Sequence, residues 1–263
     1  VPFYGNRYFK LKISGDAEAD IARLERIAGV LDRAAEPYFA TLDGNEQYSD
    51  ADAIADFYVR LTARPSLQRL CASILYVEQP INRAQALSTP VGRLARRIPV
   101  IIDESDGALS AFPQARALGY AGVSSKACKG IWKSMLNLAR AQKWSAEGGP
   151  AYFMSAEDLT CEPGICLQQD LALVGLLGLT HVERNAHHFI DGFGGRPRAE
   201  EQRFLAAHPD LYHEQDGRVR LRIEGGNLSV ASLETPGFGA SVDPEFDAAE
   251  PMPKAAWPMA GSR

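Results

Sequence analysis

The chain has 263 residues, of which 46% are hydrophobic, and this length allows one barrel-sized domain or two ordinary ones. Its formal net charge is −5 at pH 7, and no basic stripe is present, so nucleic acid and anionic membrane surfaces are not expected partners. No apolar run reaches the roughly 18 residues of a membrane span. Four sparse cysteines without a CxxC pair favour a reduced, cytoplasmic setting.

One pattern repeats along most of the chain: a short β-rich apolar run, polar residues, a loop and a segment with helical periodicity. Such alternation indicates parallel strands joined by crossover helices. The pattern predicts seven strands, which are Tyr8–Ile13, Ala40–Asp43, Leu75–Glu78, Val100–Asp103, Gly122–Lys126, Ala151–Ser155 and His181–Arg184.

The helical segments between these strands carry apolar side chains at steps of three and four residues, as helices that pack on a sheet do. The first segment shows this pattern between Ile21 and Leu31. The last segment is apolar on nearly every side, which predicts that it is well buried. After the first helix we expect Ile54–Leu61, Ala108–Leu118, Ile131–Ala141 and Leu167–Leu179.

The alternation ends after the seventh predicted strand. A short helix is expected near Ala199–Ala207, and Gly217–Gly226 alternates basic and apolar residues as a single strand or a hairpin does. The sequence beyond Glu234 is rich in Pro, Gly and Ala, which is typical of a surface tail. We therefore expect a barrel in residues 1–190, followed in residues 191–263 by a helix and an extended tail that packs on it.

Carboxylates stand at the predicted ends of three successive strands, at Asp43, Glu78 and Asp103. In a (β/α) barrel the carboxyl ends of the strands converge on one mouth, so these side chains would be neighbours. Three oxygen ligands suit a hard cation, and Mg²⁺ is the expected one because it accepts a few carboxylates and keeps some of its waters. A single Asp at such a place is more often a helix N-cap, but three in successive units favour a metal site.

Lysines stand at the ends of two further strands. Lys10 and Lys12 lie on the same face of the first strand, because side chains alternate between the two faces. Two charges on one face of a buried strand are costly unless a site uses them, although solvated strand-end lysines are the alternative. Lys126 ends the fifth predicted strand, so lysines can face each other across the metal.

The segments FKLKISGD, TLDGNEQ, LYVEQPINR, VIIDESDG and VSSKACKG resemble, in order and spacing, segments of the mandelate racemase and muconate-lactonising branch of the enolase superfamily. The resemblance implies an α/β fold with a TIM-like (β/α) barrel, in which a KxK motif ends the second barrel strand. It implies that metal ligands end the third, fourth and fifth strands. No histidine stands near Ser155, which favours the lysine–lysine type.

The resemblance also implies a role for each residue. Asp43, Glu78 and Asp103 would bind one Mg²⁺, Lys12 and Lys126 would be the acid/base pair, and Lys10 would assist electrostatically. Weaker assignments, to the substrate or to support of the ligands, fall on Asn45, Glu104, Glu157, Arg184 and Asn185.

These roles imply Mg²⁺-dependent removal of a proton alpha to a carboxylate through a stabilised enolate. The products would be those of racemisation, epimerisation, cycloisomerisation or dehydration of a small carboxylic or sugar acid. The family also has an N-terminal capping domain and a first barrel strand, which we expect this chain to lack, and its members are often homo-oligomers. Two alternatives stay open: a Schiff-base lyase on a TIM barrel with Lys126 as nucleophile, and a non-catalytic metal-binding barrel fragment.

Overall fold

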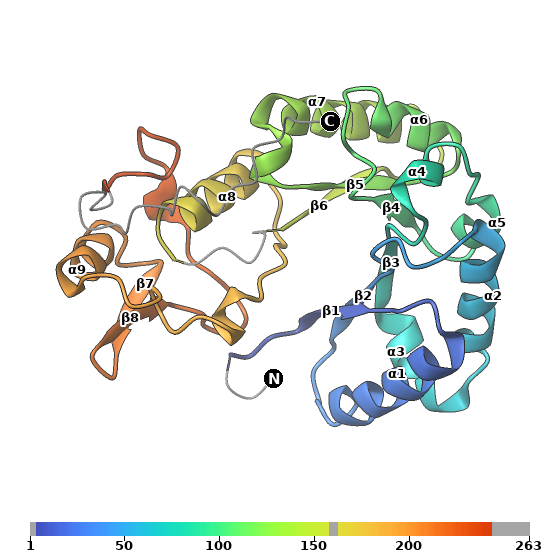
Figure 1. Ribbon diagram of the computed structural model, residues 1–263, viewed down its shortest axis with the longest axis horizontal. Helices are drawn as coiled ribbons and strands as arrows, with labels where there is room; N and C mark the ends of the chain where they lie inside the picture. Colours follow the sequence, from blue (N-terminus) through green and yellow to red (C-terminus); the bar gives the residue numbers. More distant parts are fainter. Residues whose placement is uncertain (1–3, 158–162, 244–263) are drawn as a thin grey trace, which may run out of the picture.

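The structure, a computed structural model, describes residues 4–157 and 163–243. Its main feature is a six-stranded parallel sheet in the order β1-β2-β3-β4-β5-β6, so each strand lies beside its neighbour in sequence. The sheet curls, and the helices that connect its strands cover the outer side, which makes the assembly half of a barrel (Figure 1). The predicted α/β class with parallel strands and crossover helices is confirmed in this form.

The strands are three to five residues long, and they match the first six predicted strands to within a few residues. They are β1 (Tyr8–Lys12), β2 (Phe39–Asp43), β3 (Ile74–Glu78), β4 (Val100–Ile102), β5 (Gly122–Ser125) and β6 (Phe153–Ala156). The helices between them are α1 (Ala17–Leu31), α2 (Ala51–Thr62), α3 (Gln68–Ser73), α4 (Arg83–Ala86), α5 (Gly92–Ala95), α6 (Ala111–Ala117) and α7 (Ile131–Ala146).

The seventh predicted strand, His181–Arg184, is wrong as a strand. Only Glu183 forms an isolated parallel bridge, to Glu157 beyond the end of β6. The segment contains one apolar residue among four, so it offers too little apolar surface to be buried as a barrel strand. It nevertheless lies beside β1, because the ring of His181 is centred 4.1 Å from the ring of Tyr8.

The main hydrophobic core lies between the sheet and its helices. In α1 the fully buried Leu24 and its neighbour Ile21 face the sheet, where Leu42 and Val77 are equally buried. The helix begins at the point where the Asp16 carboxylate accepts hydrogen bonds from two backbone N–H groups of the first turn. The amphipathic pattern read from the sequence therefore marks the side of the helix that the sheet covers.

A second core forms in the C-terminal part, which contains α8 (Ile165–Leu176), α9 (Arg198–Ala207) and the strands β7 (Tyr212–Gln215) and β8 (Arg218–Leu221). The two strands pair as an antiparallel hairpin, so the alternation after Gly217 marked its second strand and missed its first. The helix predicted near Ala199–Ala207 is confirmed as α9. No helix within the described residues is long and apolar enough to cross a membrane.

The last barrel helix is well buried, as expected, except at its end. Leu167 and Leu171 of α8 pack in the second core, but Leu176 is 53% exposed. The helix lies between the half-barrel and the C-terminal elements (Figure 1), and it contacts the turn at Ala127–Lys129 after β5 and the turn at Ala231–Leu233. The division of the chain at residue 190 stays a prediction.

The backbone turns sharply where β2 ends, and this turn carries two residues assigned to the site. The Gly44 N–H donates to the Glu78 carbonyl at 2.9 Å, and Asn45 adopts a positive φ of 37°. A Cβ atom on Gly44 would lie 2.6 Å from the Cα of Pro80, which is closer than real Cβ contacts come. Glycine at this position therefore lets the chain pass close to the end of β3.

We expect Gly44→Ala to destabilise the protein by roughly 1–3 kcal/mol, because the added methyl group pushes the β2 turn away from β3. Chemical denaturation would measure the change in the free energy of unfolding. Gly107→Ala is the matched control, because a Cβ there meets no atom within 4 Å. Equal stability of the two variants would contradict the prediction.

Candidate active site

The first three strands end in register at the same edge of the sheet. Lys12 is the Cα partner of Asp43, and Asp43 is the Cα partner of Glu78. Parallel strands present their carboxyl ends together, so residues separated by more than thirty positions in sequence become direct neighbours. The predicted convergence of these three residues is therefore present in the fold.

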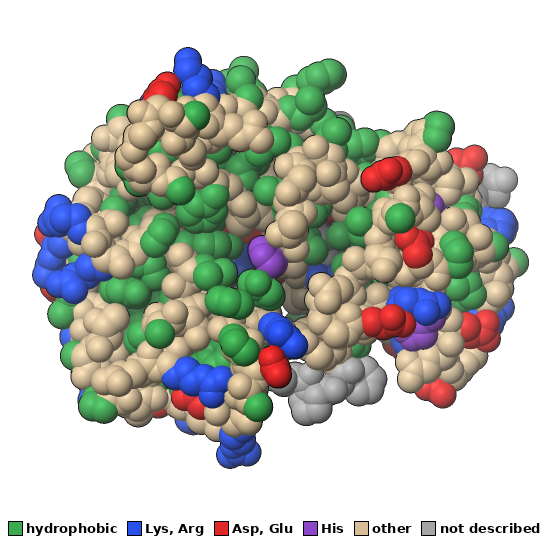
Figure 2. All heavy atoms as spheres, turned by 180° about the vertical axis from the view of Figure 1, so that it is seen from behind, with side chains coloured by type: hydrophobic (Ala, Val, Ile, Leu, Met, Phe, Trp, Pro, Cys, Tyr) green, Lys and Arg blue, Asp and Glu red, His purple; other side chains and the backbone are tan. Residues whose placement is uncertain are grey.

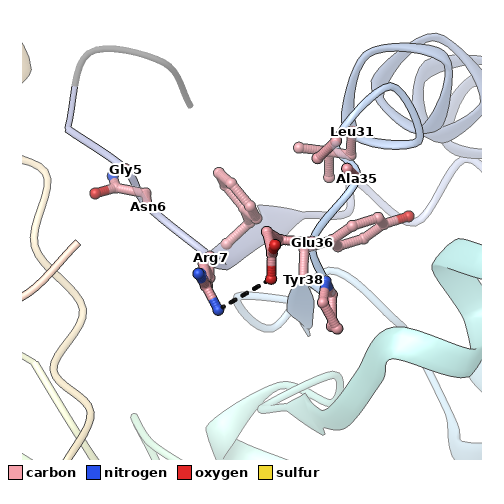
Figure 3. Close-up of a pocket in the computed structure, with 10 residues that line it drawn as sticks. Gly5, Asn6, Arg7, Leu31, Ala35, Glu36 and Tyr38 are labelled. Carbon is pink, nitrogen blue, oxygen red and sulfur yellow. Dashed lines mark ion pairs between the residues drawn. The ribbon is translucent and has the colours of Figure 1, made fainter. Parts of the chain in front are cut away.

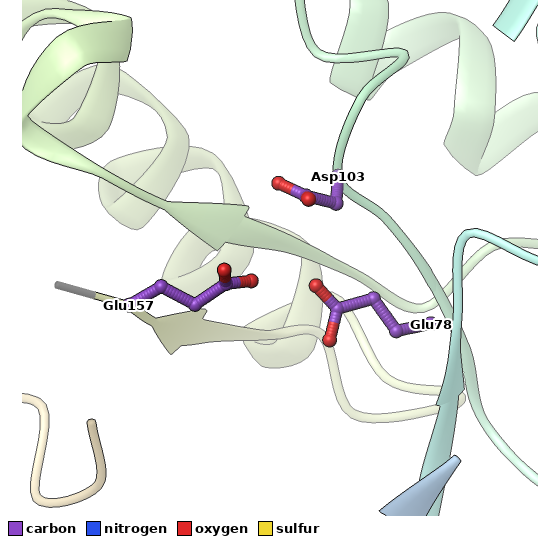
Figure 4. Close-up of side chains that lie close together, drawn as sticks. All are labelled: Glu78, Asp103 and Glu157. Carbon is purple, nitrogen blue, oxygen red and sulfur yellow. The ribbon is translucent and has the colours of Figure 1, made fainter. Parts of the chain in front are cut away.

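Three carboxylates point toward one another at this edge, from Glu78 at the end of β3, Asp103 just after β4 and Glu157 just after β6 (Figure 4). One oxygen from each lies within 4.8 Å of the others, and Glu78 and Asp103 are almost fully buried. The group has the oxygen donors that a hard divalent cation takes. Two of its three members are predicted ligands, and the third, Glu157, is a residue that the sequence marked only weakly.

The remaining predicted ligand, Asp43, lies beside this group with both of its oxygens engaged. Its Oδ2 accepts from Lys12 at 2.6 Å and contacts the Lys10 ammonium at 2.9 Å. Its Oδ1 accepts from the backbone N–H of Asn45 at 2.9 Å. Asp43 therefore lies next to the three clustered carboxylates, and its own charge is compensated by Lys10 and Lys12.

Lys10 occupies the centre of the carboxylates. Its side chain is 9% exposed, and its Nζ lies 2.5 to 3.0 Å from four carboxylate groups, those of Asp43, Glu78, Glu157 and Glu183. Burial acts to lower the pKa of Lys10, but the charges of these four acids outweigh burial and raise it. Lys10 is therefore an ammonium ion that is held firmly in the charged form.

The two lysines assigned to proton transfer contact different carboxylates of the network. Lys12, on β1, is 50% exposed and pairs with Asp43, whereas Lys126 follows β5 and is mostly buried. The Lys126 Nζ lies 2.6 Å from Asp103 Oδ2 and 3.1 Å from Glu157 Oε2. Burial acts to lower the pKa of Lys126, but the charges of Glu157 and Asp103 prevail and raise it.

Two residues of this network were missed in the sequence. Lys129 Nζ donates to Asp103 Oδ1 at 2.7 Å and to the carbonyls of Asp103 and Ser124, so it fixes the other side of the Asp103 carboxylate. Glu183 contacts Lys10 from the segment mistaken for a strand. Both missed residues lie close to residues that the sequence analysis did assign to the site: Lys129 is three residues after Lys126, and Glu183 directly precedes Arg184 and Asn185.

The residues assigned to supporting roles are distributed over two places. Asn45 Nδ2 donates to Glu104 Oε1 at 3.1 Å, which links the β2 turn to the loop after β4 beside the predicted ligands Asp43 and Asp103. Arg184 and Asn185 directly follow Glu183, and the side-chain oxygen of Asn185 is buried without a hydrogen-bond partner in the described part of the chain. The functional roles of these residues stay predictions.

A separate pocket lies at the opposite end of the first two strands, where β1 and β2 begin (Figure 3). Its volume is about 220 Å³, and the ion pair between Arg7 and Glu36 spans it at 3.7 Å. The pocket therefore does not coincide with the carboxylates.

The back face of the molecule is also hollowed near its middle, with basic side chains visible inside the hollow (Figure 2).

No protein-family model and no curated protein matches this chain. Several solved structures match it in fold. An enolase from Bradyrhizobium complexed with magnesium and mandelic acid shares 17% identity, with a TM-score of 0.58 over 91% of this chain and 53% of its own. A muconate lactonizing enzyme from Mycobacterium smegmatis shares 21% identity, with a TM-score of 0.57 over 94% of this chain and 58% of its own.

A dipeptide epimerase from Methylococcus capsulatus, complexed with a magnesium ion, shares 21% identity, with a TM-score of 0.51 over 84% of this chain and 56% of its own. The likeness is one of fold. The half-barrel is consistent with the barrel of enolase-superfamily enzymes of the mandelate racemase and muconate-lactonizing type. This chain spans little more than half the length of these structures.

The carboxyl groups of Glu78 and Glu157 are close enough to influence each other's protonation. Burial raises the pKa of Glu78 well above its usual range; the Lys10 charge opposes this, and the charges of Glu157 and Asp43 add to it. For Glu157 burial also acts to raise the pKa, but Lys10, Glu78 and Lys126 together lower it. Glu78 therefore keeps its proton at a pH where Glu157 is ionised.

We expect the affinity of the site for a divalent cation to rise with pH, because Glu78 must lose its proton before both of its oxygens can face a metal. Calorimetric titration with Mg²⁺ between pH 6 and pH 8, in buffers that differ in heat of ionisation, would measure both affinity and proton release. Below the raised pKa of Glu78, binding should weaken and release a proton. Affinity that does not vary with pH would contradict the assignment of Glu78 as a metal ligand.

Proposed function

We propose that this protein uses Mg²⁺ and two lysines to remove and return a proton on the carbon beside a substrate carboxylate. The observation that carries the proposal is the arrangement of carboxylates at the ends of successive parallel strands, with a lysine on either flank. Ion pairs run from Lys12 through Asp43, Lys10 and Glu157 to Lys126, so the two outer amines belong to opposite sides of one network.

Asp43, Glu78 and Asp103 are the proposed metal ligands, with one carboxylate from each of three neighbouring strands. A cation reaches the first two together, because the Lys10 ammonium contacts Asp43 at 2.9 Å and Glu78 at 3.0 Å. Glu78 Oε1 is buried and has no hydrogen-bond partner in the described part of the chain, as expected of an oxygen kept for a metal. Bound Mg²⁺ supplies a Lewis acid where negative charge develops on the substrate carboxylate.

The two outer lysines move the proton in this proposal. Lys126, whose contacts with Asp103 and Glu157 favour its ammonium form, delivers a proton from its side of the network. Lys12 takes the proton on the other side as the neutral amine, after the ammonium that pairs with Asp43 in this structure has lost a proton to solvent through its half-exposed side chain. An acid and a base on opposite faces of one carbon invert its configuration, so racemisation or epimerisation is the reaction that the arrangement favours.

The substrate class in this proposal is a small carboxylic acid. Solved structures of similar fold contain mandelic acid in one case and the dipeptide D-Ala-L-Val in another, and both molecules carry a carboxylate beside a C–H group. A sugar acid with a hydroxyl on the next carbon would undergo dehydration by the same proton removal. The proposal has four further parts. The enzyme is of the lysine–lysine type and works in the cytoplasm, a capping segment is its partner, and it forms homo-oligomers.

The Schiff-base alternative has weaker support. An amine that attacks a carbonyl must be neutral, and Lys126 is paired with two carboxylates that raise its pKa and favour the ammonium form. The non-catalytic alternative predicts a metal site without any need for a lysine at each end of the charged network. Borohydride trapping with substrate tests the first alternative, and α-proton exchange tests the second.

The assignment of the third ligand predicts different effects for two substitutions. Asp43→Asn should weaken Mg²⁺ binding more than about 100-fold because it removes a ligand, whereas Glu157→Gln should weaken it by about tenfold or less as a supporting group does. Calorimetric titration of both variants would measure the difference. The reverse order would assign the third carboxylate to Glu157.

We expect Lys126→Ala to lower racemisation by roughly 10²- to 10⁴-fold, because it removes one of the two groups that exchange protons with the substrate. The measurement is ¹H NMR of α-proton exchange in D₂O with Mg²⁺, for mandelate, N-acyl amino acids, dipeptides and acid sugars. Mg²⁺ binding should not weaken, since Lys126 is not a ligand. Lys143→Ala, at an exposed lysine of α7, is the control, and equal exchange in both variants would remove Lys126 from the mechanism.

A further inference from the structure

Lys10 already fills the space where a cation would reach the carboxylates. Its ammonium lies within 3.0 Å of four acids, and two of them, Asp43 and Glu78, are proposed metal ligands. Each of the other lysines of the network contacts fewer acids: Lys12 pairs with Asp43 alone, and Lys126 with Asp103 and Glu157. Lys10 is therefore the lysine whose position conflicts most directly with a bound metal.

Electrostatics requires some cation at this point. Asp43 and Glu78 are 1% exposed, and buried carboxylates that face one another without compensation are strongly destabilising. One ammonium can compensate them, and so can one divalent cation. The two cannot occupy the same place, because Mg²⁺ binds oxygens at about 2.0–2.1 Å and would repel a positive charge held against those oxygens.

We infer that Lys10 is the internal counter-ion of the metal-free site and that a divalent cation binds by displacing its ammonium from Asp43 and Glu78. This inference rests on the proposed function, because it takes the metal site from there. Lys10 is attached to β1 on the same face as Lys12, so its displaced amine stays at the mouth of the half-barrel. The release of Lys10 also leaves Lys12 as the one lysine in contact with Asp43 Oδ2, and the Lys10 contact explains why Asp43 is not one of the three carboxylates that point toward one another.

The test compares Lys10→Met with Lys12→Met, two substitutions of neighbouring lysines on the same strand face. In the wild type, part of the free energy of Mg²⁺ binding is used to displace the Lys10 ammonium. Lys10→Met has no ammonium to displace, so this variant should bind Mg²⁺ at least about tenfold more tightly. Lys12→Met should change the affinity by about threefold or less, because Lys12 is 50% exposed and contacts a single acid. Calorimetric titration with Mg²⁺ at fixed pH and ionic strength measures all three proteins.

Thermal unfolding gives a readout that is independent of affinity. In EDTA, Lys10→Met should melt at a lower temperature than the wild type, because four acids lose their contact with the Lys10 ammonium. Saturating Mg²⁺ should raise its melting temperature by more than it raises that of the wild type or of Lys12→Met.

A second pair of variants covers the case in which Lys10→Met does not fold. Glu183→Gln removes an acid that contacts Lys10 and is not a proposed ligand, so Lys10→Met with Glu183→Gln restores part of the local charge balance. The double variant should bind Mg²⁺ more tightly than Glu183→Gln alone.

The outcomes separate this inference from the proposed function. If the wild type binds Mg²⁺ and the loss of Lys10 leaves binding unchanged or weaker, displacement is wrong and the metal site stands. If neither the wild type nor any Lys10 variant binds Mg²⁺, both the metal site and the displacement are wrong. Tight binding by the Lys10 variants alone would support displacement in its strongest form.

Discussion

Repulsion between buried carboxylates is the constraint on which the site depends. Several acids meet at the carboxyl edge of the sheet, where little water is present to screen them. Four lysines compensate these charges: Lys10 contacts four of the acids, Lys12 contacts Asp43, and Lys126 and Lys129 contact Asp103. A buried charge cluster of this size is costly for a fold that needs only stability, which makes a function for it the simpler explanation.

The parallel fold produces the cluster by bringing strand ends together. Each strand pairs with the next one along the chain, so every connecting helix returns the chain to the same starting edge and every strand ends at the same opposite edge. The short turn at Gly44 keeps β2 close to β3 there, and the Asn45–Glu104 hydrogen bond joins the turn to the loop after β4. The edge of the sheet thus holds the charged groups, while the main hydrophobic core lies between the sheet and the helices on its outer side.

The chemistry that suits this edge follows from its charges. Removal of a proton beside a carboxylate adds negative charge to a group that is already an anion, so a concentration of cations is what the reaction needs. The paired acids serve the same purpose indirectly, because their charges hold Lys10 and Lys126 in the ammonium form. Three solved structures have a similar fold, and two of them contain magnesium.

The sequence by itself determined the order of the first six strands and the convergence of Lys12, Asp43 and Glu78, because strand periodicity and the geometry of parallel sheets are local or general properties. Only the tertiary structure decided which carboxylates come within reach of one cation. Glu157 joins the group, Asp43 turns toward lysines, and Glu183 arrives from a segment that forms no strand. Periodicity indicates the face on which a side chain lies, but the partner it contacts depends on competition among charges from distant parts of the chain, which no local pattern contains.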